Sequence, residues 1–168
     1  MIKLAGICAV FLAARIFYEN YVEKDENYVK KYEDISLFIN LFYVNFIELK
    51  MPFKISAELL LHKISPFADK IIENFLVNCN DKKGISEREA LVRAIGKNDI
   101  GKNAKRAVAE FFTAAAVSDK ETVKMRRDIT IKQLEEQIEI QRKVSEGKCK
   151  TAGALAFAVS AVTVIILI

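Results

Sequence analysis

Ser118-Asp119-Lys120-Glu121 opens the stretch that decides the fold, and this stretch runs to Ile168. Its spacing predicts a helix capping box, in which the serine accepts a hydrogen bond from one backbone N–H group and the glutamate reaches back to another. Charged and apolar residues mix as in a helix up to Glu146, and residues 152–168 carry no charge. A helix of that uncharged length spans about 26 Å, close to the roughly 30 Å of a bilayer core. We therefore predict an exposed helix that continues into a C-terminal membrane helix at residues 151–168.

A second apolar segment lies at the N-terminal end of the chain. Leu4–Ala14 is apolar or small throughout and is bounded by Lys3 and Arg15. A cleaved secretory signal has the same order of a basic start, an apolar stretch and small residues. A retained membrane helix, with the arginine reaching the interface, is the alternative. We favour a retained helix over residues 1–18, because no convincing cleavage site follows and the helical pattern continues beyond it.

The charged residues lie between these two segments. All 22 acidic residues fall between Glu19 and Glu146, and the net charge of +4 is too small and too interspersed to indicate nucleic acid. Basic residues flank both apolar segments: Lys24, Lys30, Lys31, Arg142, Lys143, Lys148 and Lys150. Because basic flanks favour the cytoplasmic side, we expect residues 19–150 to form a cytoplasmic domain anchored at both ends.

Helical periodicity divides this domain into successive helices. The first has one apolar face and should end near Lys50, before Pro52: Ile35, Phe38, Ile39, Phe42, Phe46 and Leu49. The next helices are a short one with Ile55 and Leu59, one capped at Ser65-Pro66, one opened by the capping box Ser86-Glu87-Arg88-Glu89, and a largely buried one at Ala104–Val117. Since no window alternates with period two, the sequence predicts an all-α, multi-helix bundle.

Few residues suggest chemistry. Gly96-Lys97-Asn98-Asp99-Ile100-Gly101-Lys102-Asn103 matches a phosphate-binding loop except at its last position, where a Ser or Thr should hold magnesium. A helix precedes it instead of a buried strand, so we interpret it as a loop between helices. His62 is the single histidine, and no motif places a nucleophile near it, so a partly exposed helix histidine is expected.

Cysteine and carboxylate patterns lead to the same conclusion. Cys8, Cys79 and Cys149 form neither a disulfide framework nor a metal-ligand spacing. Neighbouring carboxylates such as Glu135 and Glu136 point about 100° apart around a helix, which does not suit joint acid–base catalysis. We therefore expect no enzyme activity, no cofactor, no metal and no small-molecule substrate, and the partner-binding residues stay unknown.

The order of several motifs resembles the stage III sporulation protein AB family. The motifs are the Lys3-Leu4 opening, Met51-Pro52-Phe53, the capped helix at Ser86–Ala90, the helix start at Ser118–Glu121, and the apolar terminus that ends Ile-Ile-Leu-Ile. The resemblance implies a helical cytoplasmic domain similar to the F-type platform proteins of type II secretion systems. It also implies a membrane component of the channel complex between mother cell and forespore, on the mother cell side. Such a platform has no activity of its own and couples a secretion-type ATPase, here the sporulation AA protein, to other membrane proteins.

Two other functions fit the same composition. One is a tail-anchored helical adaptor or signalling domain unrelated to secretion. The other is an exported protein whose N-terminal signal is cleaved, in which case the helical domain would lie outside the cytoplasm.

Overall fold

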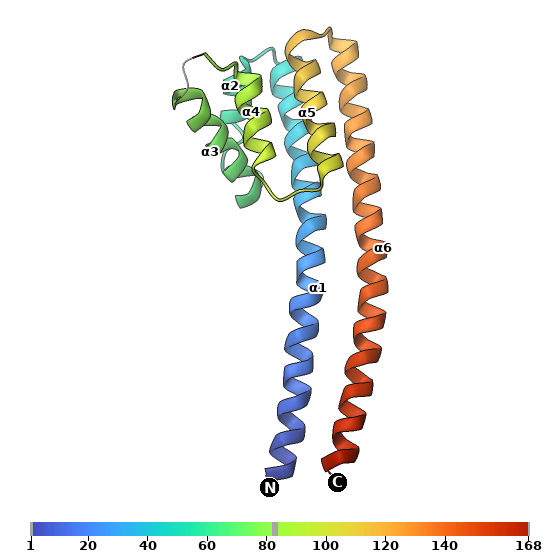
Figure 1. The fold of residues 1–168 in the computed structure, drawn as a ribbon. Coiled ribbons are helices and arrows are strands. Elements are labelled where there is room, and N and C mark those ends of the chain that lie inside the picture. The colour runs from blue at the N-terminus through green and yellow to red at the C-terminus, as the bar shows by residue number, and fades with distance from the viewer. Residues whose placement is uncertain (1, 82–83, 168) are drawn as a thin grey trace. The chain divides into compact units, whose positions relative to one another are not determined.

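The computed structural model describes residues 2–81 and 84–167, including the side chains of residues 26–80 and 84–151 and of scattered positions in the terminal segments. The chain divides into two compact units: Met1–Val29 with Glu139–Ile168 form unit 1, and Lys30–Ile138 form unit 2. Every regular element among the described residues is a helix, which confirms the predicted all-α class (Figure 1).

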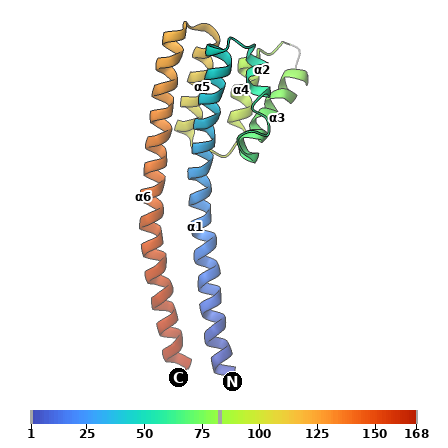
Figure 2. The ribbon, with the colours of Figure 1, turned by 180° about the vertical axis from the view of Figure 1, so that it is seen from behind.

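The helices follow one another along the chain with short connections. They are α1 (Ile2–Tyr43), the π-helix η1 (Val44–Glu48), α2 (Phe53–Glu58), α3 (Pro66–Asp81), α4 (Glu87–Gly96), α5 (Lys102–Val117) and α6 (Lys120–Leu167). Unit 2 contains α1 from Lys30 onward and α6 up to Ile138, and these parts run alongside α5. The α2, α3 and α4 helices lie together on one side of them (Figures 1 and 2). Within unit 1, the start of α1 lies beside the end of α6.

The predicted membrane helices are not confirmed. Over the described part of the chain, no helix combines the length and the apolar character that crossing a membrane requires. Most side chains of residues 1–18 and 151–168 lie outside the described residues. The two membrane segments, and the division of the chain after residues 18 and 150, therefore stay predictions.

Phenylalanine rings form the centre of unit 2. Phe42 of α1 is fully buried, and its ring centroid lies 4.9 Å from that of Phe53 in α2 and 5.0 Å from that of Phe112 in α5. Phe53 also reaches Phe75 of α3 at 6.3 Å. The aromatic side chains thus join four helices, as the apolar face of the first predicted helix indicated. The α5 helix is buried on one face only, which corrects the expectation of a largely buried helix: Val108, Phe111 and Phe112 are buried, whereas Arg106, Glu110 and Thr113 are exposed.

Two helices of unit 2 begin at the serine caps that the sequence predicts. The Ser65 hydroxyl accepts a hydrogen bond from the N–H of Ala68 at 3.2 Å, and the Ser86 hydroxyl accepts one from the N–H of Glu89 at 3.3 Å. Each serine satisfies a backbone donor that the first turn of a helix leaves unpaired.

The cap of α6 differs from the predicted capping box by one residue. Asp119 accepts hydrogen bonds from the N–H and the hydroxyl of Thr122, at 2.9 and 2.8 Å. These two hydrogen bonds hold the pKa of Asp119 below its ordinary value of 3.8, and the bond from the backbone N–H has the larger effect. Ser118 instead ends α5, and its N–H donates to the carbonyl of Ala114. Only Ser118 and Asp119 connect α5 to α6. Because Ser118 ends α5, the carboxylate of Asp119 caps α6.

The first predicted helix ends at Glu48, close to the expected Lys50, but its last turn is not a regular α-helix. Regular α-helix stops at Tyr43, and the N–H of Leu49 then bonds the carbonyl of Val44, five residues back. This wider π turn shifts the side chains away from the 3.6-residue period. Leu49, predicted on the apolar face, is consequently 57% exposed. Lys50 takes the left-handed conformation with φ 53°, which turns the chain toward α2.

A polar cluster, which we call the Glu48 clamp, fastens η1 to α6. Its members are Tyr43, Glu48, Lys120 and Arg127. The Tyr43 hydroxyl donates to Glu48 Oε1 at 3.1 Å, and Lys120 Nζ donates to Glu48 Oε2 at 2.6 Å. The Arg127 guanidinium lies 4.3 Å from the centroid of the Tyr43 ring. The hydrogen bond from Lys120, and to a smaller extent the one from Tyr43, lowers the pKa of Glu48. The same bond to Glu48 raises the pKa of Lys120.

Removing the Phe42 ring should destabilise unit 2. Phe42→Ala should lower the free energy of unfolding by about 3–5 kcal/mol, because it leaves a cavity among packed rings. Urea unfolding of the full chain in detergent micelles, followed by circular dichroism, measures this change. The control Leu49→Ala, at an exposed position, should change the value by no more than about 0.5 kcal/mol. Equal losses in the two variants would contradict the aromatic core.

The Glu48 clamp predicts a pH dependence. The pKa of Glu48 is lowered, so its stabilisation is present above the ordinary pKa of 4.5 and is lost as the pH falls through the lowered value. Glu48→Gln should therefore lower the melting temperature of unit 2 by about 1–3 °C at pH 7, since one exposed ion pair contributes little. Melting curves of wild type and variant should converge toward pH 3. A gap of the same size at pH 3 and pH 7 would exclude an ionic clamp.

Candidate interaction surface

The stretch that resembles a phosphate-binding loop connects two helices, as the sequence predicts. It begins at Gly96, the last residue of α4, and leads into α5 at Lys102. The N–H of Gly101 donates to the Tyr32 hydroxyl at 3.2 Å, and Lys105 Nζ donates to the carbonyl of Gly96 at 2.9 Å. A Cβ atom on Gly101 would lie 2.8 Å from the Tyr32 hydroxyl, so only glycine permits this approach to α1. The loop therefore holds α1, α4 and α5 together within unit 2.

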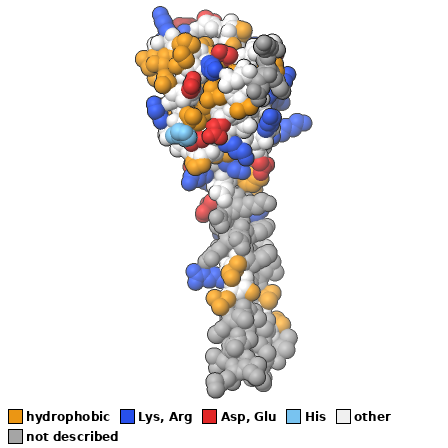
Figure 3. Space-filling model, turned by 90° about the vertical axis from the view of Figure 1, so that its left-hand side faces the viewer, with side chains coloured by type: hydrophobic (Ala, Val, Ile, Leu, Met, Phe, Trp, Pro, Cys, Tyr) orange, Lys and Arg blue, Asp and Glu red, His pale blue; other side chains and the backbone are white. Residues whose placement is uncertain are grey.

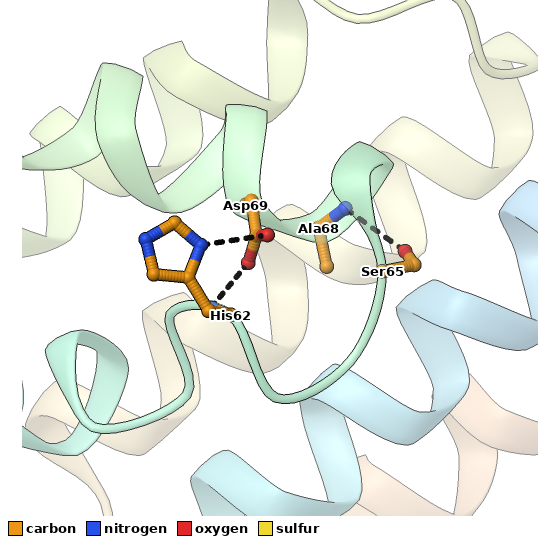
Figure 4. Close-up of polar contacts among 4 residues, drawn as sticks. All are labelled: His62, Ser65, Ala68 and Asp69. Atoms are coloured by element: carbon orange, nitrogen blue, oxygen red, sulfur yellow. Dashed lines mark hydrogen bonds and ion pairs between the residues drawn. The ribbon is translucent and has the colours of Figure 1, made fainter.

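His62 lies in a turn and not in a helix, which corrects the prediction for this residue. Its backbone N–H donates to Asp69 Oδ1 at 2.7 Å, and its Nδ1 lies 3.2 Å from Asp69 Oδ2 (Figure 4). The imidazole is 74% exposed, and the residue adopts φ 61°. Since α2 ends at Glu58, the carboxylate at the start of α3 holds the connecting turn. These contacts give His62 a structural role in the turn.

Other reactive side chains are dispersed. Among the residues that the structure describes, no group of three or more His, Cys, Asp or Glu side chains could hold a metal ion. Cys79 and Cys149 are half-buried free cysteines, and the side chain of Cys8 lies outside the described side chains. Burial raises the pKa of the Cys79 thiol, and the charge of Glu87 adds to this effect. A thiol with a raised pKa stays protonated at neutral pH and is a poor nucleophile.

The most distinctive exposed feature of unit 2 is apolar. Five large aliphatic side chains of α1, the π-helical segment and α2 are between 40 and 57% exposed, and we call them the α1–α2 apolar surface: Leu37, Val44, Leu49, Ile55 and Leu59. Hydrophobic side chains gather at the upper left of the face shown in Figure 3, on the side of unit 2 that carries α2 and α3. Exposed apolar area of this kind is typical of protein–protein contact sites.

Helix geometry places these side chains on outward faces. Leu37 and Val44 are seven residues apart on α1 and η1, and Ile55 and Leu59 are four apart at α2, so each pair shares a face. The opposite face of α2 is directed into the core by Phe53 and Ala57, which are buried together with Leu60 of the following turn.

One hydrogen bond and one ring contact hold the two elements together. Asn45 Nδ2 donates to the carbonyl of Ser56 at 3.2 Å, and the rings of Phe42 and Phe53 are in edge contact. Ser56 Oγ in turn donates to the carbonyl of Pro52 at 2.9 Å. The buried hydroxyl and its partners therefore fix the position of α2, and with it the position of the exposed Ile55 and Leu59.

The sequence predicted no partner-binding residues, although it carries a signal for part of this surface. Leu37 and Val44 fall outside the stripe formed by Ile35, Phe38 and Phe42, so α1 carries apolar residues on a second face. A helix that packs against one core needs only one such face. Ile55 and Leu59 gave no comparable signal, because short α2 is apolar on both sides.

Comparison with known proteins identifies the family. The sequence matches the family model of stage III sporulation protein AB over residues 3–168. No curated protein and no solved structure matches the chain. Because the match extends over nearly the whole sequence, the chain belongs to the stage III sporulation protein AB family, as the order of its motifs indicated.

Proposed function

We propose that this protein is a non-enzymatic membrane platform subunit of the channel complex between mother cell and forespore, and that it docks a secretion-type ATPase. Membership of a stage III sporulation family gives the role in sporulation. The platform role rests on the all-helical fold and on the resemblance of the sequence to the F-type platform proteins of type II secretion systems. In this role the protein transmits or holds a contact and catalyses nothing.

The α1–α2 apolar surface is the observation that carries the docking proposal. Its side chains are exposed, although burial of apolar surface stabilises a protein or a complex by about 25 cal/mol per Å² of area removed from water. The surface lies on helices that the phenylalanine core holds in place, so it is preorganised for a partner. The partner we propose is the sporulation AA ATPase, with other membrane proteins of the complex beside it.

Membrane attachment through both chain ends completes the proposal. Residues 1–18 and 151–168 would anchor the protein in the cell membrane, and residues 19–150 would lie in the mother cell cytoplasm. The uncharged sequence of residues 152–168 and the basic flanks of both segments support this arrangement.

Docking can be tested by co-purification. The full chain, solubilised in mild detergent, should retain the sporulation AA ATPase on an affinity column. Ile55→Asp with Leu59→Asp should reduce the recovered ATPase at least tenfold, because two carboxylates would be buried without partners in the complex. Both positions are exposed in the free protein, so the variant should keep its circular dichroism spectrum.

A matched variant controls for a general effect of added charge. Met125→Asp changes a side chain of α6 that is 55% exposed and lies outside the α1–α2 apolar surface. It should retain the ATPase as wild type does. If the aspartate variants and wild type recover equal amounts of ATPase, the α1–α2 apolar surface is not the docking site. If wild type recovers no ATPase, the docking role itself is wrong.

The cytoplasmic placement of unit 2 predicts protection from external reagents. Lys97→Cys in a Cys8→Ser, Cys79→Ser and Cys149→Ser background places one thiol at an exposed loop position. An impermeant maleimide should label it in permeabilised cells and fail to label it in intact cells. Labelling in intact cells would support the exported alternative and exclude the proposed orientation.

A further inference from the structure

One end of unit 2 is rich in exposed basic side chains. Between Arg93 and Arg106 the chain has five basic residues and one acidic residue, Asp99. This segment comprises the end of α4, the following loop and the start of α5. Lys97 and Lys102 are both exposed, and neither makes a side-chain hydrogen bond or ion pair within the described part of the chain.

Two contacts bring α1 to the same end. Lys31 Nζ lies 3.8 Å from Asp99 Oδ2, and Gly101 donates its N–H to the Tyr32 hydroxyl. Lys31 therefore lies beside the loop between α4 and α5, and the exposed Lys30 precedes it on α1, about 100° around the helix.

The turn before α3 reaches this end as well. The Ser65 hydroxyl donates to Asp34 Oδ2 at 2.7 Å, and Lys31 Nζ lies 5.8 Å from the centroid of the Phe67 ring. The turn that carries the exposed Lys63 therefore reaches α1 near Asp34. We call the resulting cluster the basic end: Lys30, Lys31, Lys63, Lys97, Lys102 and Lys105. Lys and Arg side chains gather along the lower edge of unit 2 in Figure 3.

Acidic groups also lie at this end. Asp34 accepts the Ser65 hydroxyl, Asp69 holds His62, and Asp99 pairs with Lys31. Glu33 follows on α1, and Glu136 of α6 lines a hollow with Asn103 and Arg106. The six lysines of the basic end outnumber these five carboxylates, so a net positive charge remains that an external acidic group can neutralise.

We propose that the basic end binds an acidic segment of a protein partner, a chain stretch with several Asp or Glu residues. The inference rests on the proposed function in one respect, because it takes the partner to be a component of the same complex. Complementary charge of this kind speeds the encounter of two proteins and sets their orientation. The interaction is exposed, so it weakens as salt is added.

An anionic membrane is the other surface that exposed lysines could meet. The lysines of the basic end come from three segments of unit 2 that the contacts of Tyr32 with Gly101 and of Ser65 with Asp34 hold together. A chain stretch with several carboxylates can pair with lysines in such a fixed arrangement.

Binding of a decaglutamate peptide to the full chain in nanodiscs of neutral lipid tests the proposal. Affinity at 50 mM NaCl should fall about tenfold in Lys97→Glu with Lys102→Glu, and it should weaken steeply in wild type at 300 mM NaCl. The matched control is Lys124→Glu with Lys132→Glu, at two exposed positions of α6, which should change the affinity less than twofold. Equal effects of the two charge reversals would overturn the proposal, because binding would then depend on overall charge alone.

A second measurement decides between a protein and a membrane. Hydrogen exchange of residues 97–105 should be slowed by decaglutamate and should be the same in neutral nanodiscs and in nanodiscs with anionic phosphatidylglycerol. Slower exchange in the anionic nanodiscs alone would assign the basic end to the membrane and overturn the proposal.

Failure of this inference and failure of the docking role give different results. If wild type retains the ATPase but reversal of Lys97 and Lys102 leaves decaglutamate binding intact, only the basic end is wrongly assigned. If decaglutamate binding depends on those lysines but wild type does not retain the ATPase, the ATPase is the wrong partner and the basic end stands.

Discussion

Packing of the Phe42 ring is the constraint on which the rest of unit 2 depends. Its neighbours come from α1, η1, α2 and α5: Phe38, Phe46, Phe53, Phe111 and Phe112. Edge contacts between aromatic rings are directional, so they fix the orientation of the helices as well as excluding water. The short α2 helix has too few turns to be stable alone and depends on this contact. The α1–α2 apolar surface therefore exists as a defined surface only because Phe53 is held against Phe42.

Periodicity predicted the helices well because the core follows it. Ile35, Phe38 and Phe42 recur at helical steps and are all buried. The change to a π turn at Val44 cannot be recognised in the apolar pattern, because Phe42, Phe46 and Leu49 continue at three- and four-residue steps. The exposure of Leu49 was consequently missed. The shift of the α6 cap to Asp119 has a similar cause: serine and aspartate cap helices about equally well, so spacing alone cannot choose between them.

Surfaces were harder to predict than the core, because a surface is assembled from segments that are distant in sequence. The basic end joins α1, the turn before α3 and the loop after α4, and of these segments only the last is visibly basic in the sequence. The contacts of Tyr32 with Gly101, of Lys31 with Asp99 and of Asp34 with Ser65 bring the three segments together. The α1–α2 apolar surface left a partial signal in the second apolar face of α1. The exposure of Ile55 and Leu59, the other part of this surface, depends on which side of α2 packs against the core.

The two surfaces would make different contributions to one assembly. Burial of the α1–α2 apolar surface supplies affinity that persists in salt, since removal of apolar area from water does not depend on charge. The basic end instead governs how fast and in which orientation an acidic partner arrives, and its effect declines with ionic strength. A subunit with both surfaces can select its partner by charge and retain it by apolar contact. Neither step needs a reactive side chain, which is consistent with the dispersed cysteines and the single histidine bound into a turn.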